Sequence, residues 1–151
     1  MKRLVFYFLK ALAFISRAFG AKHIYMRILC LAHKSQGVRF EGNPEYIQAD
    51  AYLDPSGGLT IHEGVVISTK VIILTHDWSF LKRHNAKNKN AFRPVEIGKN
   101  SFIGAGAILL PGTIIKERCI IGAGAVIKGI IPNEAIMVGN PAKNINQISA
   151  T

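Results

Sequence analysis

Aliphatic residues recur at every sixth position between residues 97 and 127, a spacing that neither a helix nor a strand produces. An α-helix repeats about every 3.6 residues and a strand every 2. The run is Ile97, Ile103, Leu109, Ile115, Ile121 and Ile127, and two positions before each later member stands a small residue: Ser101, Ala107, Thr113, Cys119 and Ala125. A strict hexad is typical of a parallel β-helix, in which each hexad forms one flat wall of a triangular coil. We therefore predict that these aliphatic side chains point inward and stack from coil to coil.

The same period extends upstream and is then interrupted. Ile61, Ile67 and Ile73 are in phase with the later run, but residues 76–94 are polar and basic and lack inward aliphatics. Long loops that leave a compact scaffold are often functional. We predict an excursion loop over residues 76–94, with His76 at the point where the wall ends.

The N-terminal segment, residues 1–36, has the pattern of a helix. Its apolar runs are interrupted by Lys10 and Arg17, and none is long enough to span a bilayer. Two compatible interpretations stay open. The helix lies on a membrane surface, with apolar side chains in the acyl boundary and basic ones at the headgroups, or it caps the open end of the β-helix.

The chain forms one domain with three parts. The helical segment at 1–36 is followed by the hexapeptide-repeat region at 37–132 and by a C-terminal tail at 133–151, because the repeat decays after Ile127.

One turn in the first coils is a candidate for the site. The tract Asp54-Pro55-Ser56-Gly57-Gly58 has the composition of a turn. Its glycines allow close backbone approach, so we expect Asp54 to contact a substrate, with a plain corner turn as the alternative.

Charge adds a preference for anionic partners. The chain has 19 Lys and Arg against 9 Asp and Glu, a formal net charge of +10, and residues 1–35 contain no acid. A basic surface favours membrane lipid, a phosphate-rich cofactor or nucleic acid. No nucleic-acid-binding motif is present, so we expect no nucleic-acid partner.

The two cysteines, Cys30 and Cys119, suggest neither a disulfide framework nor a metal site. We therefore expect no metal and a cytoplasmic location, at the inner face of the cell membrane if residues 1–35 bind lipid.

Three features together resemble a known family: the hexad run, Ile73-Leu74-Thr75-His76-Asp77, and Gly139-Asn140-Pro141-Ala142-Lys143. They are similar to the hexapeptide-repeat acyltransferases, and in particular to the sugar O-acetyltransferases of capsule, exopolysaccharide and lipopolysaccharide synthesis. The resemblance covers about residues 50 to 145. It implies an all-β fold, a left-handed parallel β-helix with an N-terminal helical segment and one long excursion loop. It also implies a homotrimer, acetyl-CoA as co-substrate and a sugar or glycan as acceptor.

The resemblance also implies roles for individual residues. His76 corresponds to the catalytic histidine. Ala105 and Ala123 match positions that line the pantetheine arm, and Lys128 and Lys143 match positions near the cofactor, although Lys128 stands where the family often has Thr. Candidates for contacts to the acceptor are Asp54, Asp77, Trp78 and Phe102, the last at a position where several members have Trp.

The implied chemistry needs a base, because a sugar hydroxyl is a poor nucleophile at neutral pH. Histidine is both neutral and basic there. We expect His76 to take the hydroxyl proton, the alkoxide to attack the thioester, and CoA to leave as a thiol. A backbone N–H near Gly104 or Ala105 would meet the oxyanion. Asp77 is adjacent in sequence and poorly placed to orient the ring, so a more distant acid or a carbonyl is expected to do so.

Several functions stay open from the residues alone. The leading hypothesis is an acetyl-CoA-dependent O-acetyltransferase that acts on a sugar of a surface polysaccharide or its precursor. The alternatives are an N-acetyltransferase of a nucleotide sugar, a serine or antibiotic acetyltransferase, and a non-catalytic trimeric β-helix scaffold.

Overall fold

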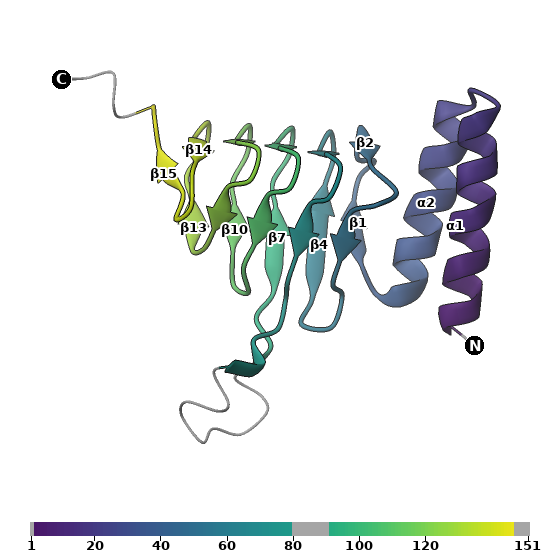
Figure 1. Ribbon diagram of the computed structural model, residues 1–151, viewed down its shortest axis with the longest axis horizontal. Helices are drawn as coiled ribbons and strands as arrows, with labels where there is room; N and C mark the ends of the chain where they lie inside the picture. The colour runs from purple at the N-terminus through teal and green to yellow at the C-terminus, as the bar shows by residue number, and fades with distance from the viewer. Residues whose placement is uncertain (1, 80–90, 147–151) are drawn as a thin grey trace.

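Two helices stand at one end of a stack of short parallel strands (Figure 1). The computed structural model describes residues 2–79 and 91–146. The helices are α1 (Lys2–Ala18) and α2 (Lys22–Gln36). The strands that follow are two to four residues long and form three sheets, which we call the first, second and third walls.

Each wall collects one strand from every coil. The first wall holds β1 (Arg39–Glu41), β4 (Leu59–His62), β7 (Val95–Ile97), β10 (Ile114–Ile115) and β13 (Ile130–Ile131). The second holds β2 (Tyr46–Ile47), β5 (Val66–Ile67), β8 (Phe102–Ile103), β11 (Ile120–Ile121) and β14 (Ile136–Val138), with β15 (Lys143–Asn144) added antiparallel at its end. The third holds β3 (Tyr52–Leu53), β6 (Ile72–Ile73), β9 (Ile108–Leu109) and β12 (Val126–Ile127).

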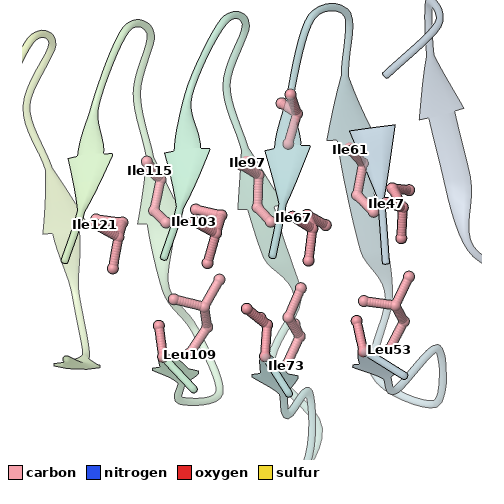
Figure 2. Packing of buried hydrophobic residues seen from close by; sticks show 14 of the residues in the cluster. Ile47, Leu53, Ile61, Ile67, Ile73, Ile97, Ile103, Leu109, Ile115 and Ile121 are labelled. Atoms are coloured by element: carbon pink, nitrogen blue, oxygen red, sulfur yellow. The ribbon is translucent and has the colours of Figure 1, made fainter. Parts of the chain in front are cut away.

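The core is the stack of inward aliphatics that the hexad predicts (Figure 2). Ile61 pairs with Ile97, and Ile97 pairs with Ile115; the other two walls repeat this register. These side chains are completely buried or nearly so. Burying one aliphatic side chain contributes about 1.5–3 kcal/mol, so the stack dominates the folding energy. The expected fold class, a left-handed parallel β-helix with an N-terminal helical segment, is confirmed.

The coils turn through a left-handed backbone conformation at the corner between the first and second walls. Gly64, Asn100, Arg118 and Glu134 occupy equivalent corner positions, with φ between 55° and 69°. This conformation is unfavourable for most side chains. It recurs here because each coil turns sharply at this corner. Close approach has a separate requirement at Gly104, where a Cβ would lie 2.7 Å from the amide nitrogen of Ala123.

The solenoid continues past residue 132, where the decaying repeat predicts that it ends. β14 pairs in parallel with β11, and Ala135 and Met137 are buried. The corner at Gly129, whose φ is +91°, separates Ile127 from the next inward residue, Ile131, by four positions instead of six. The hexad count is broken there, while the inward phase is kept.

α2 covers the first coil of the solenoid. Tyr25, Met26 and Leu29 are buried in the same apolar cluster as Val38 and Ile47. The Tyr25 hydroxyl donates to the Ile47 carbonyl at 2.8 Å, and burial raises the pKa of Tyr25 to about 12. One end of the β-helix is thereby capped, and α1 lies on the outer side of α2 (Figure 1).

His33, on α2, makes stability depend on pH. Its ring is buried against Phe6, and its Nε2 atom has no hydrogen-bond partner among the described residues. Burial, and then the charge of Lys10, lowers its pKa to about 4. The unfolded chain therefore binds this proton between about pH 6.5 and pH 4 whereas the folded chain does not, so stability falls as the pH drops through this window.

We expect His33→Leu to remove about 2 kcal/mol of the stability difference between pH 7 and pH 5. Urea unfolding at the two pH values measures it. His23→Leu, at an exposed position on the same helix, is the control and should keep the wild-type pH dependence. An unchanged dependence in His33→Leu would contradict the assignment.

Candidate functional site

His76 lies just beyond β6, where the chain leaves the third wall. Its Nδ1 atom is 2.7 Å from Asp54 Oδ2 and 3.1 Å from the Ser56 hydroxyl oxygen. The imidazole side chain is 27% exposed, whereas that of Asp54 is 4% exposed. A partly open histidine therefore rests on a buried carboxylate.

The register of the third wall brings these residues together. Leu53 of β3 pairs with Ile73 of β6, so the residues that follow the two strands are neighbours on adjacent coils. The Gly57 amide donates to the Thr75 hydroxyl at 2.8 Å. A Cβ at Gly57 would lie 2.1 Å from the Thr75 carbonyl oxygen, so this close approach requires glycine.

The Asp54 carboxylate is saturated with hydrogen bonds. Its Oδ1 atom accepts from the Ser56 amide at 3.0 Å and hydroxyl at 2.7 Å, and Oδ2 accepts from the Thr75 amide and hydroxyl, both at 2.8 Å. Burial raises the pKa of the carboxyl group, but the bonds from Ser56 and Thr75 outweigh burial and hold the pKa well below its usual range. Asp54 is therefore ionised and can only accept.

The ionised carboxylate fixes the tautomer of His76. Because Asp54 Oδ2 cannot donate, the hydrogen of this 2.7 Å contact sits on Nδ1 of His76. The Ser56 hydroxyl already donates to Asp54, so it also accepts from Nδ1. In the neutral ring Nε2, the nitrogen directed away from Asp54, then carries the free lone pair. This is the arrangement that a general base needs.

A cleft of about 270 Å³ opens beside His76. It is lined by Leu74, His76, Asp77, Ser79, Arg93, Leu110, Pro111 and Lys128. Trp78 and Phe92 flank the imidazole, with ring centroids 5.9 and 6.3 Å from it and 5.7 Å from each other. His76 thus has an aromatic border on one side and the cationic side chains of Arg93 and Lys128 in its cleft.

The structure brings together some of the residues that the sequence nominates. Asp77 and Lys128 share the cleft with His76, and Trp78 stands at its border. Asp54 lies beneath the ring. Its carboxylate accepts hydrogen bonds from Ser56, Thr75 and His76. Asp54 therefore contacts the histidine, where the sequence predicted a contact to a substrate.

Other nominated residues lie elsewhere on the chain. Phe102 is exposed on β8 in the second wall. Ala105 and Ala123 stack on the corner between the second and third walls, where the Gly124 amide donates to the Ala105 carbonyl at 2.8 Å. Lys143 is on β15. Within one chain these four positions do not line the His76 cleft.

Sequence reasoning missed Ser56, Thr75, Phe92 and Arg93. Ser56 and Thr75 complete the carboxylate's hydrogen bonds, and Phe92 forms an isolated antiparallel bridge with His76. The 20-residue offset between Leu53 and Ile73 places position 76 opposite position 56, and this offset would have identified Ser56. The described residues contain no group of three or more His, Cys, Asp or Glu side chains that could hold a metal ion.

Comparison with known proteins finds one family model and several similar chains. Residues 94–129 match the family described as bacterial transferase hexapeptide (six repeats). A protein of Schizosaccharomyces pombe provisionally named as an acetyltransferase is 38% identical over 92 residues, which are 60% of this chain and 44% of that protein. The protein WbbJ of Escherichia coli K12, provisionally named as a lipopolysaccharide biosynthesis O-acetyl transferase, is 27% identical over 121 residues, with 74% and 62% of the two chains covered.

Two solved structures are similar to the solenoid. A maltose O-acetyltransferase from Clostridium difficile 630 is 33% identical with a TM-score of 0.51, over 72% of this chain and 56% of that one. A galactoside acetyltransferase in complex with coenzyme A is 21% identical with a TM-score of 0.60, over 79% of this chain and 69% of that one. At this identity the similarity is one of fold. The chain thus spans less than two thirds of the length of both named relatives and of the maltose enzyme.

Proposed function

We propose that this chain, which resembles the hexapeptide-repeat acyltransferases in sequence and fold, transfers an acetyl group from acetyl-CoA to a sugar hydroxyl of a surface polysaccharide or its precursor. The observation that carries the proposal is the pair of His76 with the buried, ionised Asp54. The names of the O-acetyltransferases to which the chain is similar support the reaction class.

The proposed reaction uses His76 as general base. Its Nε2 takes the proton of the acceptor hydroxyl as the oxygen attacks the thioester carbon, and the C–S bond breaks as the tetrahedral intermediate collapses. The proton returns to the sulfur, so CoA leaves as a thiol and His76 is neutral again. Asp54 stabilises the imidazolium that forms in between, and general-base help of this kind contributes about 10²–10⁴-fold.

Acetyl-CoA is the acetyl donor in this proposal. Ala105 and Ala123, which stack on one corner, would follow the pantetheine arm, and Lys128 and Lys143 would meet its phosphates. An amide on this track would receive the oxyanion. Asp77, Trp78 and the aromatic border are the proposed acceptor side of the cleft.

A homotrimer is part of the proposal. In a single chain Phe102 and the Ala105–Ala123 corner are separate from the His76 cleft. A neighbouring copy would supply the missing face, so His76 of one chain and the cofactor track of another would form one site. Because acetyl-CoA is a cytoplasmic metabolite, we place the reaction in the cytoplasm.

Thiol release from acetyl-CoA tests the proposed function. The purified chain is incubated with glycan fractions of its own cells, and free thiol and acetylated product are followed together. We expect release that depends on the glycan and a product whose acetyl group is labile to hydroxylamine, as an ester is. A hydroxylamine-stable amide would instead indicate N-acetylation. Failure to bind CoA by calorimetry, with no thiol release, would indicate the non-catalytic scaffold.

A further inference from the structure

α1 turns its apolar side away from the protein. At 3.6 residues per turn, its large apolar residues other than Phe6 and Leu9 fall within about half of the helix circumference. We define the apolar face by five of them, Leu4, Phe8, Leu12, Phe14 and Ile15, together with Phe19, which directly follows the helix. Phe8 is 68% exposed and Phe19 is 84% exposed. A surface helix ordinarily buries its apolar stripe against the core, and here most of that stripe faces outward.

Residues outside the apolar face attach α1 to the protein. Ala13 is the buried residue of the helix. Arg17 donates to the Gln48 side chain at 2.9 Å and lies over the Tyr25 ring at 5.8 Å, and the Gln36 amide group donates to the Lys2 carbonyl at 3.0 Å. The helix is therefore held in place without its apolar face, which is left to contact something else.

The charges beside the apolar face are of one sign. Arg3, Lys10 and Arg17 lie along one edge of it by helical spacing. Residues 1–35 hold seven Lys and Arg and no acid. A second copy placed symmetrically on this face would bring like charges together, whereas an anionic lipid surface complements them.

We propose that α1 docks in the plane of an anionic membrane surface, with its apolar face in the acyl boundary and Arg3 and Lys10 beside it at the headgroups. A helix of 17 residues is about 26 Å long and fits flat on a bilayer. In the part of the chain that the structure describes, no helix has both the length and the apolar content to cross one.

Docking through α1 sets the position of the His76 cleft. The helices stand at the end of the solenoid next to β1 and β2 (Figure 1). In the third wall, β6 is the second strand from that end, so His76 lies in the membrane-proximal half. If the proposed function holds, this position favours an acceptor glycan that is itself anchored to lipid. The docking does not depend on that function.

Co-sedimentation of the full chain with vesicles tests the docking. We expect the chain to pellet with vesicles of mixed phosphatidylcholine and phosphatidylglycerol, to bind pure phosphatidylcholine at least about tenfold more weakly, and to be released partly by salt. The double variant Phe8→Asp/Phe14→Asp should lose at least about tenfold in affinity for the mixed vesicles. Both positions are exposed, so the fold should be kept.

Ile130→Asp is the matched control, because Ile130 is an exposed aliphatic residue on β13, toward the other end of the solenoid. It should bind vesicles as the wild type does, and so should His76→Ala, whatever its activity. Absence of binding to mixed vesicles, or equal binding to both kinds, would overturn the proposal. So would a wild-type oligomer that ignores vesicles and dissociates in the Phe8→Asp/Phe14→Asp variant, because a second copy would then cover the face.

Discussion

Replacing His76 with alanine is expected to lower kcat for acetyl transfer by about 10²–10⁴-fold. The side chain supplies the only nitrogen in the described cleft that a neighbouring carboxylate holds ready to accept a proton. The ring is partly exposed and packs against Trp78 and Phe92 at the border of the cleft, so its loss should leave the solenoid assembled. Steady-state thiol release measures the effect, and sedimentation velocity checks the assembly.

His62 provides the matched control for His76. It also contacts a carboxylate, with Nε2 2.9 Å from Glu96 Oε1, but it lies on β4 in the first wall and outside the cleft. His62→Ala should retain activity within about twofold, because it removes a partly exposed side-chain contact of small energetic value outside the cleft. Turnover by His76→Ala that matches the wild type would rule out the general-base role.

Replacing Asp54 with asparagine is expected to lower kcat on the order of 10²–10⁴-fold, with little change in KM for acetyl-CoA. Asparagine is neutral, so it cannot stabilise the imidazolium that forms when His76 takes a proton. An NH₂ in the place of Oδ2 would also donate toward His76 Nδ1, which must then accept, so the ring proton moves to Nε2. A protonated Nε2 cannot take the proton of the acceptor. We therefore propose Asp54 as a positioning residue that acts through His76.

Two measurements separate this positioning role from a structural one. Activity of Asp54→Asn should not recover at any pH at which the protein stays folded, because the tautomer and not the charge of the ring is wrong. Asp50→Asn is the control, since Asp50 also accepts from a threonine, Thr69 of the adjacent coil, but lies away from the cleft. Its kcat should equal the wild-type value. A similar loss in both variants would indicate a general structural effect.

The walls could be predicted from the sequence because each hexad is nearly self-contained. One inward aliphatic and one small corner residue, such as Ile103 and Ser101, specify a wall and a corner without information from the rest of the chain. The prediction failed where a corner changed length. Because of the turn at Gly129, the inward residues Ile127 and Ile131 are four positions apart instead of six. The segment with β13 and β14 was therefore interpreted as the decay of the repeat.

The site was predictable only in part. The interrupted repeat drew attention to His76, but its partner Asp54 is 22 residues away and was assigned to the substrate. Their contact follows from the pairing of β3 with β6, which fixes which residues of adjacent coils meet. The apolar runs interrupted by Lys10 and Arg17 predicted a helix at the N-terminus. It could not tell which side of α1 faces the protein, because the two sides differ in packing partners and not in period.

Nitrogen-15 NMR of the His76 ring tests the general-base arrangement most directly, and it needs no knowledge of the acceptor. The His76 signals are assigned by their absence from the His76→Ala spectrum. At neutral pH the wild type should show a protonated Nδ1 and an unprotonated Nε2, and Asp54→Asn should show the reverse. A wild-type ring that carries its proton on Nε2 would contradict the role proposed for Asp54 and, with it, the mechanism.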